Sequence, residues 1–126
     1  MSIRGIGTDL VSMARIAAVL TRHGDRFRDR VLTPDEHRAF DDPAQEARWL
    51  AKRWAAKEAV AKAFGTGIGA QLSFQDIVIG REPAGRPTVT LRGDALQLAH
   101  DRGVTQVHLS LSDEQDLALA FVVLEG

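Results

Sequence analysis

The 126-residue chain contains no cysteine. A disulfide framework, a thiolate metal site and a cysteine nucleophile are therefore all excluded. The chain also has no apolar run close to the ~20 residues that a membrane span needs, so we expect no transmembrane segment. Its N-terminus is strand-like and lacks the basic stretch and apolar core of a secretory leader. We therefore expect no signal peptide and a cytoplasmic location.

The chain has almost no net charge, with 16 Lys and Arg against 17 Asp and Glu. Such a chain is not built as a whole to coat nucleic acid or an anionic membrane. Residues 1–63 nevertheless hold 12 basic and 9 acidic residues, and residues 64–126 hold 4 and 8. Arg15, Arg22 and Arg26 fall on one stripe of a helix if that helix is continuous. The stripe is either an ordinary solvated face or a docking surface for an acidic partner.

No repeat, linker or low-complexity segment divides the sequence, so we expect one domain over residues 1–126. Hydrophobic periodicity predicts strands at residues 3–9, 76–80, 87–91, 106–112 and 117–124. It predicts helices at residues 12–21, 27–31, 44–64 and 93–101, with a further helix start at residues 33–36. This order indicates an α+β domain in which a largely antiparallel sheet packs on the long helix.

The first strand combines large apolar residues with glycines. Ile3, Ile6 and Leu10 are expected to be buried. Gly5 and Gly7 weaken an isolated strand, so we expect their backbone to pack closely against a neighbouring element.

Two carboxylates are candidates for a magnesium site. Asp9 ends the first strand, and Glu58 lies in the middle of the long helix. Magnesium takes oxygen ligands, usually one or two carboxylates together with waters and phosphate oxygens. Either carboxylate alone is most often a surface acid or part of a helix ion pair. Here Glu58 and Lys62 share one helix face, which continues into the glycine-rich turn Gly65-Thr66-Gly67.

That turn has two interpretations. It can be a plain helix C-cap, or it can offer backbone N–H groups and a hydroxyl to a phosphate. It is not a P-loop, because no Gly-Lys-Ser/Thr follows and the glycines end a helix. Two carboxylates, a lysine and this turn together indicate a magnesium–diphosphate site better than any one of them does.

Other metal and nucleophile chemistries have little support. The four histidines are scattered and no cysteine is present, so a zinc site is not expected. Ser110 and Ser112 lack a nearby base and a Gly-x-Ser-x-Gly elbow, which leaves serine hydrolysis unsupported. His108, on the polar face of a strand, is either a structural hydrogen-bonding residue or a ligand-binding one. Arg53 and Lys57 flank the long helix.

Three collinear segments resemble the signatures of a known family. They are residues 5–11 (GIGTDLV) followed by Arg15-Ile16, residues 53–68 (RWAAKEAVAKAFGTGI) and residues 108–112 (HLSLS). The chain length also agrees, and residues 32–36 (LTPDE) are of the same type. The chain resembles the 4′-phosphopantetheinyl transferases, specifically the bacterial holo-acyl-carrier-protein synthases of fatty acid biosynthesis.

The resemblance implies an α+β transferase fold and a homotrimer whose active sites are shared between neighbouring subunits. It implies magnesium-dependent transfer of the phosphopantetheine arm of coenzyme A to a serine of an apo acyl carrier protein, with adenosine 3′,5′-bisphosphate as the other product. The acidic carrier protein would be the partner of the basic stripe of Arg15, Arg22 and Arg26.

The resemblance also assigns the site residues. Asp9 and Glu58 correspond to the magnesium ligands, and Lys62 to the lysine beside the reacting phosphate. The residues expected to contact coenzyme A are Arg53, Lys62, Gly65, Thr66, Gly67, Arg86, Pro87 and His108; among these, Arg53 and His108 are expected near the 3′-phosphate, and Arg86 and Pro87 near the adenine.

Some questions stay open at this level. Asp35 and Glu58 are both candidate bases for the serine proton. Trp54 stands where phenylalanine is usual in the family, and Asp113 where histidine is common. The rival interpretations are a magnesium-dependent phosphohydrolase or nuclease built on the same carboxylates, and a non-catalytic module that binds an acidic protein or a nucleotide through its basic helix.

Overall fold

A computed structural model describes all residues, 1–126. The elements follow the order β1 (Ile3–Ser12), α1 (Met13–His23), α2 (Asp25–Val31), the 3₁₀ turn η1 (Pro34–Glu36), α3 (Pro43–Phe64), the 3₁₀ turn η2 (Phe74–Asp76), β2 (Ile77–Arg81), β3 (Pro87–Leu91), α4 (Gly93–Asp101), β4 (Gln106–Glu114) and β5 (Leu117–Glu125). The predicted α+β class is confirmed. No helix has the length and apolar character needed to cross a bilayer.

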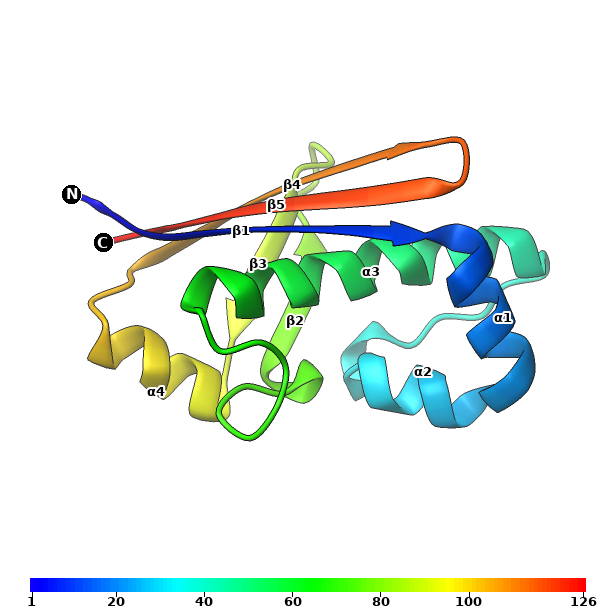
Figure 1. Ribbon diagram of the computed structural model, residues 1–126, viewed down its shortest axis with the longest axis horizontal. Helices are drawn as coiled ribbons and strands as arrows, with labels where there is room; N and C mark the ends of the chain where they lie inside the picture. The colour runs from blue at the N-terminus through cyan, green and yellow to red at the C-terminus, as the bar shows by residue number, and fades with distance from the viewer.

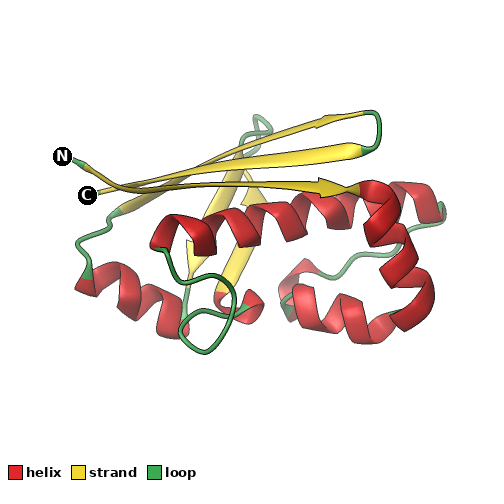
Figure 2. Ribbon diagram, in the orientation of Figure 1, coloured by secondary structure: helices red, strands yellow, loops and turns green.

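The strands form two antiparallel sheets. One has the order β1-β5-β4, and the other is the β2-β3 hairpin. Helix α3 runs along the underside of the three-stranded sheet, with the hairpin behind it (Figure 1). Helices α1 and α2 lie at one end of α3 and α4 at the other (Figure 2). The three-stranded sheet lies on one side of the helices, whereas the hairpin crosses behind α3.

Helix α3 is the centre of the core. Asp42 caps it by accepting a hydrogen bond from the backbone N–H of Ala44, and Pro43 occupies the first turn, where its missing N–H costs nothing. The helix ends at Gly65, whose φ of 76° is left-handed and suits glycine. Its buried surface is rich in alanine, which keeps that surface thin and allows the sheet to come close.

The expected burial of the large β1 residues is wrong. Ile3, Ile6 and Leu10 are 70, 62 and 60% exposed. The glycines face α3 instead, and a Cβ added at Gly7 would lie only 2.1 Å from the carbonyl oxygen of Ala59. No side chain fits on that face at this position, so the strand turns its large residues outward. The expected close packing of the β1 backbone is confirmed.

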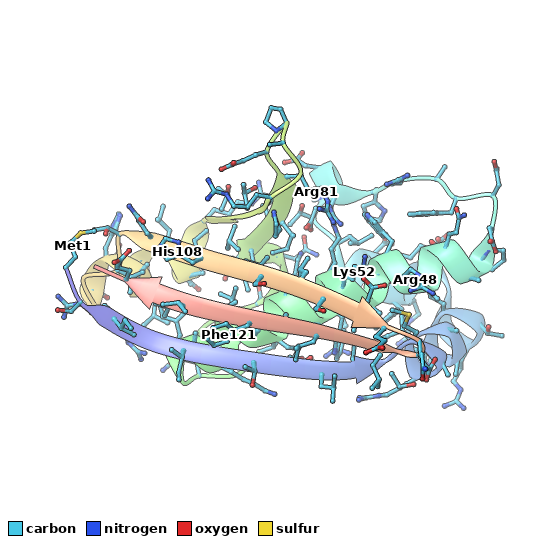
Figure 3. All side chains as sticks on the ribbon, turned by 90° about the horizontal axis from the view of Figure 1, so that it is seen from above. Met1, Arg48, Lys52, Arg81, His108 and Phe121 are labelled. Carbon is cyan, nitrogen blue, oxygen red and sulfur yellow. The ribbon has the colours of Figure 1, made fainter.

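The exposed β1 residues join exposed residues of β5 on the side of the sheet that faces away from α3. Leu10 pairs with Leu119, and Thr8 pairs with Phe121. We call Ile6, Leu10, Leu119 and Phe121 the outer apolar face. Phe121 lies on the middle strand in the view from above (Figure 3). Large apolar side chains gathered on one sheet face are typical of a surface that binds another protein.

The helix start predicted at residues 33–36 needs correction, and the arginine stripe depends on how α1 ends. Thr33 and Glu36 do form a reciprocal capping box, but only the three-residue turn η1 follows it. Gly24, at a φ of 52°, separates α1 from α2. This break agrees with the separate helices predicted at residues 12–21 and 27–31. Arg15 and Arg26 therefore lie on different helices, so the condition for a single arginine stripe, a continuous helix, is not met.

Candidate functional site

Asp9 and Glu58 come together where β1 crosses α3. The Asp9 side chain faces the helix and is 13% exposed, and its Oδ1 accepts a hydrogen bond from Lys62 Nζ at 3.0 Å. Its second oxygen, Oδ2, is buried and has no hydrogen-bond partner. Such an oxygen is unusual in a folded protein and is common where a ligand or ion completes the site.

The environment of Glu58 is consistent with a cation site. Burial raises the pKa of Glu58 above its ordinary value, and the charge of Asp9 raises it further. The charges of Lys62, Arg30 and Arg15 act in the opposite direction. A carboxylate whose ionisation is disfavoured by a neighbouring carboxylate favours a cation between the two.

The donor set fits magnesium. The fold contains no cluster of three or more His, Asp or Glu side chains arranged for a metal. A metal at Asp9 and Glu58 would therefore take its other ligands from waters and from oxygens of a substrate. This is the usual manner of magnesium binding in phosphoryl-transfer sites.

The glycine-rich turn is a helix C-cap in this structure. The N–H of Gly65 donates to Lys62 O, and those of Thr66 and Gly67 donate to Ala61 O. The Thr66 hydroxyl donates to the carbonyl of Gly67. A free set of N–H groups is therefore not present in this conformation. Gly65 and Gly67 have open space where a side chain would stand, so a ligand can approach the turn.

A second group of predicted residues lies beside the β2-β3 hairpin. Arg86, Pro87 and His108 line one polar cleft between the hairpin and β4. His108 Nε2 lies 2.9 Å from a carboxylate oxygen of Glu125, and Arg86 pairs with Glu82 at the same distance. His108 and Arg86 are exposed and their carboxylate partners are half-buried, so the cleft presents the two basic side chains to solvent.

Arg53 lies in an adjacent pocket. Its guanidinium donates to the carbonyl of Ile79 at 3.2 Å and sits 4.2 Å above the centre of the Trp49 ring. Burial lowers its pKa below the ordinary arginine value. The same pocket is lined by Arg48, Lys52, Arg81 and Pro87, and the first three are labelled in Figure 3. A pocket with this many cations is suited to a phosphate.

Asp113 has a defined structural role. Its carboxylate lies 2.7 Å from Arg48 and 3.1 Å from Lys52, and hydrogen bonds to these two side chains hold its pKa below the usual value. Asp113 thus ties the end of β4 to α3 beside the basic pocket.

The two groups do not meet within one chain. Asp9 lies on β1 and faces α3, whereas His108 lies on β4 and belongs to the exposed side of the sheet. Strand β5 separates them. Residues on opposite faces and opposite edges of a sheet cannot converge on one small group.

The structure also creates a groove between α1, α2 and α3. It is lined by Arg15, Val19, His23, Arg26, Phe27, Arg30 and Trp54. Arg15 and Arg26 were predicted, whereas Arg22 does not line the groove. Trp54 packs between the rings of Phe27 and Phe74, with centroid distances of 5.6 and 5.0 Å. Trp54 therefore acts as an apolar floor under a basic rim.

Arg30 was missed by sequence analysis. Its charge acts on the pKa of Glu58, so the groove opens close to the paired carboxylates. The signal was its position on α2 one turn after Arg26, but only the contact of α2 with η2 reveals which way it points. Arg30 sits 5.7 Å from the centre of the Phe74 ring.

Of the two candidate bases, only Glu58 lies at the carboxylate pair. Asp35 is 74% exposed and lies 3.7 Å from Arg92, with no hydrogen bond or ion pair to Asp9 or Lys62.

Comparison with known proteins identifies the family. The model of the 4′-phosphopantetheinyl transferase superfamily matches residues 5–122. The chain belongs to this superfamily. It is 48% identical, over the full length of both chains, to the holo-[acyl-carrier-protein] synthase of Serratia proteamaculans. The corresponding synthase of Edwardsiella ictaluri is equally similar, at 48% identity over the whole of both chains.

Solved structures of superfamily members have the same fold. The holo-[acyl-carrier-protein] synthase of Neisseria meningitidis superimposes with a TM-score of 0.90 at 43% identity, covering 99% of this chain and 100% of that one. The Helicobacter pylori synthase, solved in complex with coenzyme A, has a TM-score of 0.82 at 33% identity, covering 95 and 99% of the two chains.

We predict that Glu58→Gln raises the melting temperature at about pH 7 in buffer without divalent cations. The fold disfavours the ionised form of Glu58, which raises its pKa in the folded state. At a pH above this raised pKa, the ionised side chain destabilises the folded state. At a pH below the pKa in the unfolded chain, Glu58 is protonated in both states and has no such effect. The gain should therefore shrink as the pH falls and disappear near about pH 3, below the ordinary glutamate pKa, where the glutamate is protonated in both states. Thermal unfolding followed by circular dichroism measures this.

Glu114→Gln is the matched control, because Glu114 is exposed and has no ion-pair partner. It should leave the melting temperature unchanged at both pH values. An unchanged or lowered melting temperature for Glu58→Gln at neutral pH would contradict the assignment of a strained carboxylate pair.

Proposed function

We propose that this chain transfers the 4′-phosphopantetheine group of coenzyme A to a serine of an apo acyl carrier protein and releases adenosine 3′,5′-bisphosphate. The observation that carries the proposal is the meeting of Asp9, Glu58 and Lys62 beneath β1 in a member of this superfamily. Full-length relatives that are named holo-[acyl-carrier-protein] synthases and a relative solved with coenzyme A support it.

The chemistry is attack of the serine oxygen on the β-phosphorus of coenzyme A. The bond from that phosphorus to the oxygen it shares with the α-phosphorus breaks, and the bisphosphate leaves with that oxygen. The protein orients the two reactants and stabilises the developing charge. Asp9 and Glu58 would hold Mg²⁺, which would supply positive charge to the diphosphate.

Two side chains of this site have further tasks. The Lys62 ammonium is half exposed and can turn from Asp9 toward a leaving phosphate oxygen. Glu58 lies at the carboxylate pair whereas Asp35 does not, so Glu58 is the better placed candidate to accept the serine proton, directly or through a water. A hydrolase built on the same residues would need no carrier protein. The experiment described below distinguishes such a hydrolase from a transferase.

We also propose that coenzyme A spans two copies of the chain. One copy would supply Asp9, Glu58, Lys62 and the turn 65–67 around the diphosphate. The other would supply the hairpin side around the nucleotide, namely Arg53, Arg86, Pro87 and His108. The separation of these two groups within one chain supports this division, and the outer apolar face offers a surface for assembly. A homotrimer of this kind follows the family pattern.

The groove between α1, α2 and α3 is the proposed carrier-protein surface. Arg15, Arg26 and Arg30 surround an apolar floor, which suits an acidic helix that also carries apolar side chains. Arg22 adds positive charge on the exposed side of α1. Arg15 and Arg30 line the groove and their charges also act on Glu58, so a serine of the docked partner would arrive near the proposed base.

The deciding experiment is intact mass spectrometry of an apo acyl carrier protein incubated with the chain, coenzyme A and magnesium. A gain of about 340 Da, the mass of one phosphopantetheine, that disappears with a chelator would establish the transferase. Bisphosphate release with unmodified carrier protein would indicate hydrolysis. No turnover with several carrier proteins would favour a binding module.

We predict that Glu58→Gln and Lys62→Ala each fold normally and lower the transfer rate by roughly 10²–10³, because each removes one electrostatic group from the transition state. Stopped assays at saturating magnesium and coenzyme A measure the loss. Glu114→Gln is the control, because Glu114 is exposed and lies outside both the carboxylate site and the basic pocket. Transfer at the unmodified rate in both site variants would refute the assignment.

We predict that reversing the charge of Arg22 and Arg26 together weakens carrier-protein binding by roughly five- to tenfold at low salt. Arg26→Glu should account for most of the effect, because Arg26 lines the groove and Arg22 does not. Titration calorimetry at two salt concentrations measures this, and the loss should shrink at high salt. Equal affinities at low salt would remove the groove as the docking surface.

We predict that Phe121→Asp shifts the chain to the monomer, because it places a charge in the middle of the outer apolar face. Light scattering coupled to size exclusion measures the mass. Thr90→Asp, on an exposed position of the other sheet, is the control. A monomeric unmodified chain, or a variant that keeps its mass, would contradict the proposed assembly.

A further inference from the structure

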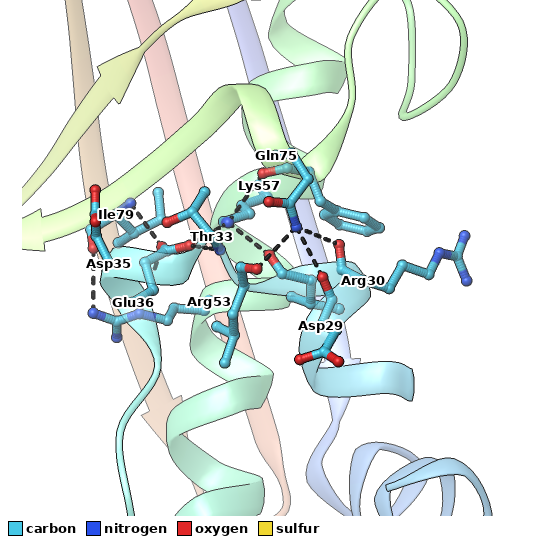
Figure 4. Close-up of polar contacts among 12 residues, drawn as sticks. Asp29, Arg30, Thr33, Asp35, Glu36, Arg53, Lys57, Gln75 and Ile79 are labelled. Carbon is cyan, nitrogen blue, oxygen red and sulfur yellow. Dashed lines mark hydrogen bonds and ion pairs between the residues drawn. The ribbon is translucent and has the colours of Figure 1, made fainter. Parts of the chain in front are cut away.

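The C-terminal end of α2 is held by two side chains that come from elsewhere in the chain. The last carbonyls of any helix have no partner within the helix. The Nε2 of Gln75 lies 2.9, 3.2 and 2.8 Å from the carbonyl oxygens of Asp29, Arg30 and Leu32. The carbonyl between them, at position 31, accepts from Lys57 Nζ at 2.6 Å (Figure 4). We call Gln75 and Lys57 the α2 clamp.

The clamp is itself fixed to the core. Lys57 is fully buried and donates to the carboxylate of Glu36 at 2.6 Å and to the carbonyl of Phe74 at 3.1 Å. Glu36 also accepts from the backbone N–H groups of Thr33, at 2.8 Å, and Ile79, at 2.9 Å. Turn η2, which carries Gln75, is thereby joined to α3 and β2.

Helix α2 needs this support. It has only seven residues and no side-chain cap at its N-terminus. A helix of this length is not stable by itself in water. Its position relative to α3 therefore depends on the packing of Phe27 and Val31, on the paired hydrogen bonds from Arg28 to Glu46 of α3, and on the contacts at its C-terminal end.

The residues that α2 presents are those of the groove. Arg26, Phe27 and Arg30 are three of the groove's lining residues, and Arg30 also acts on the charge of Glu58. A shift of α2 would move these three side chains and leave Asp9, Glu58 and Lys62 in place, because the latter belong to β1 and α3.

We propose that Gln75 is a positioning residue for carrier-protein recognition. Gln75 acts through α2: it holds Arg26 and Arg30 in the positions in which they contact acidic side chains of the partner. It touches neither coenzyme A nor the reacting serine. The inference rests on the proposed function, because it takes the groove as the carrier-protein surface.

The test uses Gln75→Leu in the full-length chain. Leucine keeps the volume and neutrality of glutamine but removes the N–H donors. Lys57 is not a suitable target, since its loss would leave Glu36 buried without its partner and could unfold the chain. Gln97→Leu is the matched control, because Gln97 donates only to Asp101 on the exposed surface of α4.

We expect Gln75→Leu to raise the KM for apo carrier protein roughly five- to tenfold, the equivalent of losing one or two hydrogen bonds. The KM for coenzyme A and kcat should stay within about twofold, which a general loss of structure would not allow. The loss should shrink at high salt, because it comes from displaced Arg26 and Arg30 contacts with the acidic partner, which salt screens. Amide hydrogen exchange should become faster in residues 25–33 and stay unchanged in α4.

The outcomes separate the two proposals. No transfer by the unmodified chain would refute the proposed function. Transfer with an unchanged KM for carrier protein in Gln75→Leu would overturn this inference alone, whatever the hydrogen exchange shows. Equal increases in the KM for carrier protein and for coenzyme A would also overturn it, because they would indicate that the whole site had moved.

Discussion

The contact between β1 and α3 determines most of this structure. Glycine backbone of β1 lies directly on alanine backbone of α3 there. A Cβ added at Gly7 would lie only 2.1 Å from the carbonyl oxygen of Ala59. Because the strand lies this close to the helix, the Asp9 side chain contacts Lys62 and lies near Glu58. The same closeness turns Ile6 outward and so creates part of the outer apolar face. One steric constraint thus produces both the carboxylate pair and a surface for association.

A second, polar centre lies on another side of α3. Lys57 is surrounded by backbone carbonyls and the carboxylate of Glu36, and burial lowers its pKa. A buried ion pair of this kind contributes little net stability, since desolvation of both charges offsets their attraction. Its contribution is to fix geometry: it joins α2, η1, η2 and β2 to a single turn of α3. The groove and the basic pocket both border on this centre.

Much of this arrangement could be predicted from the sequence. The periodic pattern located α3 and α4 within one residue, and the spacing of Glu58 and Lys62 placed both on one face. Which face of β1 is buried could not be predicted. An alternating sequence is compatible with burial of either face of a strand, and only the contact with α3 decides which one is buried. The capping-box pattern at Thr33 identified a local hydrogen-bond motif correctly, but local motifs do not specify how far a helix continues.

The buried state of Lys57 had a signal that was available but easily overlooked. Lys57 lies seven residues from both Leu50 and Phe64, so it falls on the same stripe of α3 as two core residues. A lysine on such a stripe is buried and needs a carboxylate as its partner. Glu36 was a candidate for this partner, because the capping-box pattern already predicted that it accepts a hydrogen bond from a backbone N–H. That these two meet depends on the path of the chain through residues 37–42, which no local pattern encodes.

The alternation of β1 gives one strand two separate duties. Odd-numbered positions around Asp9 face the helix and carry the chemistry, while even-numbered ones carry the association surface. Insertion or deletion of a single residue between Gly7 and Asp9 would exchange these faces, burying leucine or isoleucine against alanine backbone and sending the carboxylate outward. Substitutions at the outward positions of this strand can be tolerated one at a time, but Gly5 and Gly7 admit no side chain, and the length of the strand between Gly7 and Asp9 cannot vary.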